Sequence, residues 1–117
     1  FVVSPEQGIV QVVKALKSNP GYTQAFYDMA MAQKLAKHYD ESISYFQKVL
    51  AVDPQNTWSL YGIATNYADK RDKAKALSYL EKAMALDPEH VRPEALSQDH
   101  FEWLRGDADF QKVVGGK

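Results

Sequence analysis

Three prolines, Pro20, Pro54 and Pro88, recur at a constant interval of 34 residues (54 − 20 and 88 − 54). Each one follows an Asn or an Asp, which are residue types that favour turns. Proline cannot continue a helix, and it moves the residue before it out of the helical region of backbone space. A chain that is interrupted at a constant interval is built from copies of one structural unit. The spacing therefore predicts a repeat protein in which each copy ends at a proline.

The residues between the prolines match from copy to copy. When residues 23–56 are aligned with residues 57–90, apolar residues fall on apolar residues and small residues fall on small ones. Apolar positions recur every three or four residues, which is typical of helices that bury one face. The pattern predicts helices at 23–36, 39–52, 57–69 and 73–86.

The aligned positions resemble the tetratricopeptide repeat, a 34-residue helix-turn-helix unit with the pattern W-x2-L-G-x2-Y, then A-x3-F, then P. In these slots the first copy has Phe26, Met29, Ala30, Gln33, Ser42, Phe46 and Pro54. The second copy has Leu60, Ile63, Ala64, Tyr67, Ala76, Leu80 and Pro88. The resemblance implies an all-α fold, a right-handed α-solenoid of helix-turn-helix pairs with about seven helices. In this fold the small residues let paired helices approach closely, and the large ones fill the space beside them.

The resemblance divides a single domain, residues 1–117, into a half repeat at 1–22, full repeats at 23–56 and 57–90, and C-terminal capping helices at 91–117. The half repeat is expected to be a helix that begins at Ser4-Pro5, because serine caps helices and proline suits the first turn. This helix is apolar around most of its circumference, so a missing helix or another chain is expected to cover it. Since the chain begins with Phe, we expect it to be a trimmed, processed or partial protein.

The C-terminal segment resembles the tail that follows the last repeat in many bacterial repeat proteins. Pro93 is expected to exclude an ordinary long helix at the start of this segment. In the tail, two short helices each start at an Asp, and the predicted starts here are Asp99 and Asp107. The residues expected to cover the open end of the stack are Phe101, Leu104, Phe110 and Val113. We expect residues 114–117 to fray.

Composition argues against several functional classes. The formal net charge is −1, so no broad positive field favours nucleic acid. No apolar run approaches the ~18 residues of a membrane helix, so we expect no membrane insertion and a cytoplasmic location. Cysteine is absent, which excludes disulfides and thiolate metal sites.

The sequence carries no signal for catalysis. His38, His90 and His100 lack the i, i+4 spacing of a helical metal site, and we expect them to be solvated. No glycine loop suited to phosphate and no nucleophile motif around a serine is present. The basic cluster at 70–75 is interpreted as a solvated turn, with a contact for phosphate or an acidic partner as the alternative. We therefore expect a protein that is not an enzyme and that uses no metal or cofactor.

The resemblance also implies a binding face, because in this family the first helix of each pair lines the concave surface. Helical spacing selects its outward positions as Gln24, Tyr27, Met31 and Lys34 in the first repeat, Trp58, Tyr61 and Thr65 in the second, and Arg92 beyond it. Exposed aromatic and methionine side chains supply large contact areas, which favours an apolar or aromatic peptide. The chain is thus predicted to bind a protein or peptide as a scaffold or adaptor. The alternative interpretation is that Trp58 or Tyr61 only packs against neighbouring helices.

Some members of the family bind the terminal carboxylate of a peptide with a set of Lys, Asn and Arg side chains. The corresponding slots here hold Tyr27, Met31, Gly62, Arg92 and Leu96, of which only Arg92 matches. We therefore expect no carboxylate clamp. Two further functions stay open: self-association into a homo-oligomer through the N-terminal helix, and a role as an accessory domain of a larger enzyme.

Overall fold

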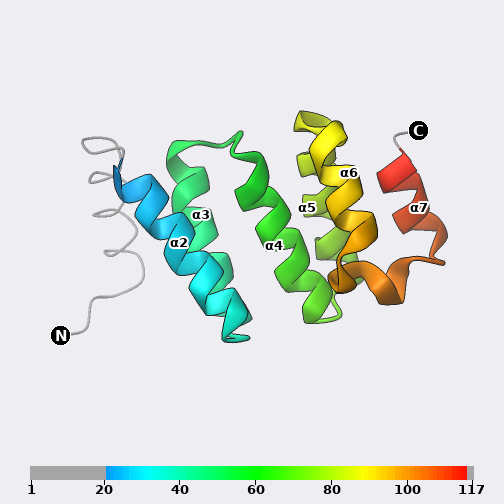
Figure 1. The fold of residues 1–117 in the computed structure, drawn as a ribbon, viewed down its shortest axis with the longest axis horizontal. Coiled ribbons are helices and arrows are strands. Elements are labelled where there is room, and N and C mark those ends of the chain that lie inside the picture. The colour runs from blue at the N-terminus through cyan, green and yellow to red at the C-terminus, as the bar shows by residue number, and fades with distance from the viewer. Residues whose placement is uncertain (1–20, 116–117) are drawn as a thin grey trace. The chain divides into compact units, whose positions relative to one another are not determined.

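The computed structural model describes residues 21–115 of the chain, and every regular element in this range is helical (Figure 1). The elements are α2 (Gly21–Leu35), α3 (Tyr39–Val52), α4 (Thr57–Asp69), α5 (Lys73–Leu86), α6 (Pro88–Ser97), the 3-10 helix η1 (Asp99–Leu104) and α7 (Ala108–Gly115). The predicted all-α fold of helix-turn-helix pairs is confirmed, and the four repeat helices start and end within two residues of the predicted bounds. The helix predicted from Ser4 lies outside the described residues.

The chain divides into two compact units, at 1–56 and 57–117, and each is described by itself. In the first unit α2 packs against α3. Ala30 and Ser42 are fully buried where the two helices meet, and the Ser42 hydroxyl donates a hydrogen bond to the Ala30 carbonyl at 2.7 Å. Phe46 is also fully buried, and the ring of Tyr27 packs edge-on against it with 5.6 Å between centroids. Small residues thus allow the close approach that the repeat pattern predicts.

One residue of the first repeat departs from this pattern. Met29 was expected to be buried, but its side chain is 41% exposed, whereas its counterpart Ile63 is fully buried. Within the described part of the first unit, α3 is the helix that packs on α2.

The second unit is centred on the α4–α5 pair. Ala64 and Ala76 are fully buried between these helices, and Ile63 and Leu80 fill the space beside them. Helix α7 packs on α5 and α6, while η1 packs on α4 and α6 (Figure 1).

The turns inside the two pairs are copies of each other. Lys37 and Arg71 occupy equivalent positions, and both have a φ of 64°, in the left-handed region that usually requires glycine. After Lys37, the amide of His38 donates to the carbonyl of Gln33 at 2.8 Å, and the equivalent bond after Arg71 is 2.9 Å. This arrangement is the Schellman motif, which satisfies carbonyls at the end of a helix.

Helix α6 begins three residues earlier in the repeat than α4 does, although an Asp-Pro pair stands at the same repeat position in both cases. The Asp87 carboxylate accepts a hydrogen bond from the amide of His90, and Pro88 occupies the first turn, where its missing N–H has no cost.

Pro93 is expected to exclude an ordinary long helix here, and α6 is shorter than both other first helices, α2 and α4, although it contains this proline. Helix α6 continues through Pro93 and ends at Ser97. Proline removes one intrahelical hydrogen bond from α6. The helix has 10 residues, whereas its counterpart α4 has 13. Because it continues to Ser97, α6 crosses the predicted boundary at residue 90.

The C-terminal helices are close to the prediction, with three corrections. Asp107 caps α7 through hydrogen bonds from the amides of Asp109 and Phe110, but the residue before η1 is Gln98 and Asp99 does not cap it. Phe101, Leu104 and Phe110 are buried as expected, and the rings of Phe101 and Phe110 stack at 5.6 Å. Val114 is buried in place of Val113. Fraying at 114 and 115 is also wrong, because α7 extends to Gly115.

Candidate functional site

The predicted binding residues of the first unit all lie along α2. Gln24 is exposed, and its side-chain amide donates to the carboxylate of Asp28 at 2.9 Å. Tyr27 is half-buried, and burial together with the Asp28 charge raises the pKa of its phenol. Met31 and Lys34 are half-buried as well. Helix α2 therefore presents a surface that is partly polar and partly aromatic.

The predicted binding residues of α4 separate into one exposed and two buried side chains. Trp58 is 36% exposed, and its ring packs edge-on against Tyr61 at 5.5 Å. Tyr61 is only 4% exposed and Thr65 is fully buried, so the expectation that both face outward is wrong. The Thr65 hydroxyl bonds to the carbonyl of Gly62 in its own helix. The alternative interpretation, packing against neighbouring helices, holds for Tyr61.

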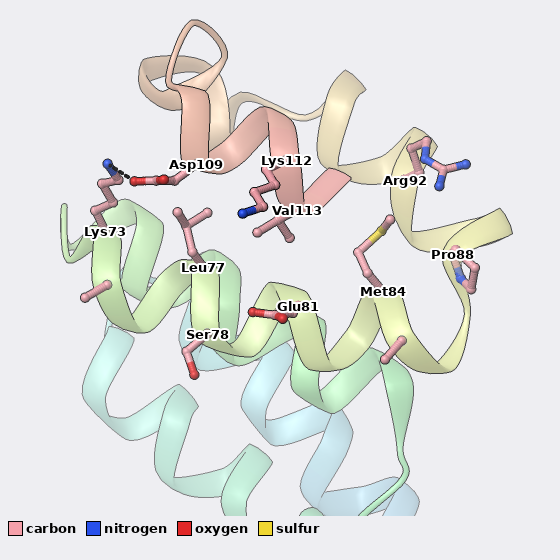
Figure 2. A pocket seen from close by; sticks show the side chains of 12 residues that line it. Lys73, Leu77, Ser78, Glu81, Met84, Pro88, Arg92, Asp109, Lys112 and Val113 are labelled. Carbon is pink, nitrogen blue, oxygen red and sulfur yellow. Dashed lines mark ion pairs between the residues drawn. The ribbon is translucent and has the colours of Figure 1, made fainter. Parts of the chain in front are cut away.

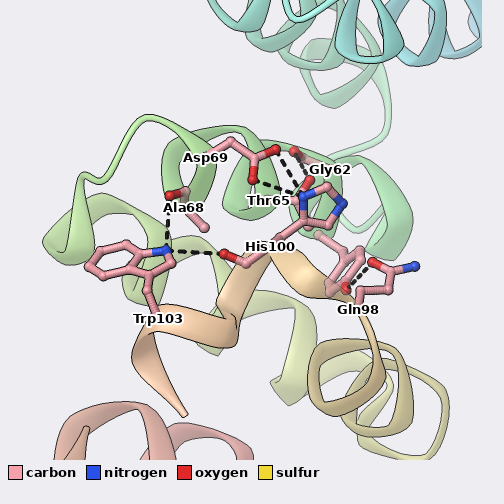
Figure 3. A network of polar contacts seen from close by, with 8 residues as sticks. Gly62, Thr65, Ala68, Asp69, Gln98, His100 and Trp103 are labelled. Carbon is pink, nitrogen blue, oxygen red and sulfur yellow. Dashed lines mark hydrogen bonds and ion pairs between the residues drawn. The ribbon is translucent and has the colours of Figure 1, made fainter. Parts of the chain in front are cut away.

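For Tyr61 the cause is the C-terminal cap, because η1 packs on α4. The Tyr61 hydroxyl donates a 2.7 Å hydrogen bond to the side chain of Gln98, which is labelled in Figure 3. The side-chain amide of Gln98 donates in turn to the carboxylate of Glu94. The ring of Tyr61 also lies 6.2 Å from that of Phe101 in η1. Burial is the main cause that raises the pKa of Tyr61, and the negative charge of Glu94 raises it further. The phenol therefore stays protonated. Tyr61 is thus a support for the cap and for Trp58.

A second set of polar contacts fixes η1 to the end of α4. The Nδ1 atom of His100 lies 2.9 Å from both carboxylate oxygens of Asp69. The indole N–H of Trp103 is 3.1 Å from the carbonyls of Ala68 and His100 (Figure 3). The prediction of a solvated His100 is therefore wrong, because this side chain is only 28% exposed and holds the cap in place.

The remaining predicted site residue, Arg92, lies in an open groove of the second unit. The groove has a volume of about 990 Å³ and is bounded by α5, α6 and α7 (Figure 2). The Nε atom of Arg92 donates to the carbonyl of Val114 at 2.6 Å. The apolar lining comes chiefly from Leu77, Met84 and Val113.

The basic cluster at 70–75 is occupied by contacts within the protein. Lys70 and Lys75 lie over the ring of Tyr67, at 5.7 and 5.3 Å from its centroid. Arg71 lies 5.0 Å from the ring of Trp103. Lys73 forms ion pairs with Asp107 at 2.7 Å and with Asp109 at 3.0 Å. These contacts favour a structural role over a contact for phosphate.

Within residues 21–115, no three His, Cys, Asp or Glu side chains gather in a way that could hold a metal ion. No helix of that range is both long enough and apolar enough to cross a bilayer.

The repeat geometry agrees with a comparison against known families. The family model of the tetratricopeptide repeat matches residues 34–96, which is more than half of the chain. The chain belongs to the tetratricopeptide repeat family. Tetratricopeptide repeats are generally protein-interaction modules and are typically non-catalytic. No curated protein matches the chain.

The sequence pattern of this tetratricopeptide repeat protein does not predict the groove beside α5. Its residues come from three helices, and Val113 was assigned to the core. A signal was present in the lengths of the predicted elements, because the short helices after residue 98 cannot cover a helix that spans 73–86.

Proposed function

We propose that this chain is a protein–protein interaction module that binds a peptide or protein segment through the first helices of its repeats, α2 and α4. Trp58 is the principal anchor on α4. The observation that carries the proposal is the geometry of this indole, which is exposed on one side and held in a fixed orientation on the other.

Trp58 is held by a neighbour that cannot move freely. Its ring contacts Tyr61, and Tyr61 is fixed by burial and by the hydrogen bond to Gln98. A side chain that is already ordered loses little conformational entropy when a partner binds. Tryptophan is also enriched among the residues that dominate binding energies at protein interfaces. A fixed and exposed Trp58 therefore supports a role in recognition.

The first repeat contributes a surface of similar character on α2. Tyr27 and Met31 offer apolar contact area, and Gln24 and Lys34 provide polar groups beside them. Aromatic rings and flexible thioethers suit apolar or aromatic segments of a partner. The proposed role is that of a scaffold or adaptor without catalytic chemistry.

The proposal is tested by selecting peptides from a displayed random library on the immobilised protein and measuring their Kd. Trp58→Ala is expected to weaken a selected peptide by about 30-fold, the effect of losing a hot spot of about 2 kcal/mol. The matched control is Trp103→Phe. Trp103 is similarly exposed at 38%, but its N–H is already bonded within the cap. If Trp58→Ala binds every selected peptide as tightly as the unchanged protein, the proposal is wrong.

Self-association through the N-terminal helix stays a prediction, since that segment lies outside the described residues. Sedimentation equilibrium over a wide concentration range tests it, and a monomer throughout would contradict it. The role as an accessory domain of a larger enzyme also stays a prediction.

A further inference from the structure

The groove beside α5 exists because the helix that packs over α5 is too short to cover it. Helix α5 has 14 residues and α7 has 8. At about 1.5 Å per residue, this difference leaves about 9 Å of α5 without cover from α7. Figure 2 shows the resulting opening, with Lys112 and Val113 on the α7 side and Met84 and Arg92 toward α6.

The shape of the groove suits an elongated apolar segment. Its lining along α5 runs from Lys73 to Ala85, a length of about 18 Å, which corresponds to three helical turns. Leu77 and Met84 form the floor and are already packed, with 8% and 6% exposure. The α5 residues beside them are small, as at Ala85, so there is space for side chains of another helix.

The charges of the groove favour a partner that carries carboxylates. Lys73 is neutralised by Asp107 and Asp109. Among residues 21–115, no carboxylate forms an ion pair with Lys112 or Arg92. Across the whole lining, three cations (Lys73, Arg92 and Lys112) stand against two carboxylates (Glu81 and Asp109), an excess of one positive charge.

We propose that this groove is a second docking surface, which binds an amphipathic helix of a partner protein through its apolar face and through carboxylates beside that face. The apolar side chains lie over Leu77, Met84 and Val113, and the carboxylates pair with Lys112 and Arg92. Helices commonly bind grooves in this way, with apolar anchors at i, i+3, i+4 and i+7. This surface uses none of the residues on α2 or α4.

The N-terminal segment of a second copy is a poorer match for the groove. Residues 1–20 are apolar, but their charged side chains are Lys14 and Lys17 against a single Glu6. Two lysines would meet the cations of the groove, and like charges at an interface oppose binding. Charge complementarity therefore selects a different, acidic partner.

The experiment measures the binding of labelled peptides to the full chain by fluorescence anisotropy. A small set of amphipathic peptides of about 18 residues carries leucines at helical spacing and glutamates beside them, and a matched set carries lysines instead. The glutamate peptides are expected to bind at least about tenfold more tightly than the lysine peptides.

Charge variants of the protein test the same contacts. Lys112→Glu should weaken the binding of the glutamate peptides by about tenfold. Lys82 is an exposed α5 residue outside the groove, so Lys82→Glu should change their binding little. Glu81→Gln should strengthen binding a few-fold, because it removes the opposing carboxylate.

A steric pair of variants tests the location. Ala85→Tyr fills the groove and should abolish binding. Ala51→Tyr places the same side chain at the exposed equivalent position of α3, 34 residues earlier, and should leave binding unchanged. Trp58→Ala should also leave it unchanged, which separates this site from the surface proposed above.

Three results would overturn the inference. The first is that the glutamate peptides bind no more tightly than the lysine peptides, or that neither set binds. The second is an unchanged affinity in Ala85→Tyr. The third is self-association of the protein that Ala85→Tyr abolishes and Ala51→Tyr does not, because the occupant would then be a second copy.

Discussion

The two tryptophans show how the surroundings of a single residue decide its role. Trp58 and Trp103 are exposed to nearly the same degree, 36% and 38%. The N–H of Trp103 is bonded to the carbonyls of Ala68 and His100, and its ring lies beside Arg71. Trp58 contacts Tyr61 by its ring. Trp103 thus holds the cap in place, while Trp58 keeps an open face for a partner.

The hydroxyl of Tyr61 provides a direct test of how the cap is attached. Tyr61→Phe removes only the hydrogen bond to Gln98 and should lower the free energy of unfolding by about 0.5–1.5 kcal/mol. Urea denaturation measures the change. Tyr79→Phe is the control, because the ring of Tyr79 stacks on Tyr67 and the packing is retained. Equal stability of Tyr61→Phe and the unchanged protein would show that the bond to Gln98 contributes nothing.

The pair of Asp87 and His90 predicts a pH-dependent contribution to stability. The hydrogen bond to Asp87 raises the pKa of His90, with the Asp87 charge adding to the shift. A raised pKa means that the folded state favours the protonated imidazole. The stabilisation is therefore complete below the ordinary pKa of histidine and is lost as pH rises through the raised value. The melting temperature of the unchanged protein should exceed that of His90→Gln by more at pH 5 than at pH 9, and a difference independent of pH would contradict this.

At the scale of elements, the repeat explains the helix pairs and fails to explain the cap. The period of 34 residues fixes four helices because each copy repeats its small residues, its large residues and its proline. The proline rule anticipates that α6 is short, with 10 residues against 13 in α4, but it does not show that the helix continues through Pro93. The repeat also could not predict that Phe101 in η1 packs against Tyr61, because that contact joins residues more than thirty positions apart.

The repeated turn after α2 and α4 predicts unequal effects of glycine. A left-handed residue other than glycine costs about 1–2 kcal/mol, and glycine adds about 0.4–1 kcal/mol of entropy to the unfolded chain. Lys37→Gly should therefore stabilise the protein by about 0.5–1 kcal/mol. Arg71→Gly should stabilise the protein by less, because it removes the contact between Arg71 and Trp103, which is worth about 0.5–1 kcal/mol. Thermal unfolding ranks the two variants, and a larger gain for Arg71→Gly would refute the explanation.

The cap depends on a buried aromatic cluster. Phe101 is fully buried, stacks on Phe110 and approaches Tyr61. Phe101→Ala should lower the free energy of unfolding by about 3–5 kcal/mol, the usual effect of removing a buried phenylalanine. Chemical denaturation measures it, with the exposed Leu96→Ala as control. A loss below about 1 kcal/mol, which is the scale of a surface substitution, would contradict a packed cap.

For the whole molecule, the sequence predicts the family and the class of function, and the structure shows which of the predicted residues are exposed. The proline spacing and the aligned slots lead to the tetratricopeptide repeat, which the family comparison shows. Helical spacing alone placed Trp58, Tyr61 and Thr65 on one outward stripe. It could not separate them, because exposure depends on the cap that packs on α4. The groove beside α5 likewise depends on the unequal lengths of packed helices.

The central claim, that this module binds partners through Trp58, is tested most directly by the fluorescence of Trp58 itself. The chain has 2 tryptophans, so Trp103→Phe leaves Trp58 as the only tryptophan, and excitation at the red edge of the absorption band avoids the tyrosines. Titration with a peptide selected from a displayed library should shift the emission to shorter wavelength as the indole leaves water, with saturation at the independently measured Kd. An unchanged Trp58 spectrum while a label on the peptide reports full binding would contradict the account.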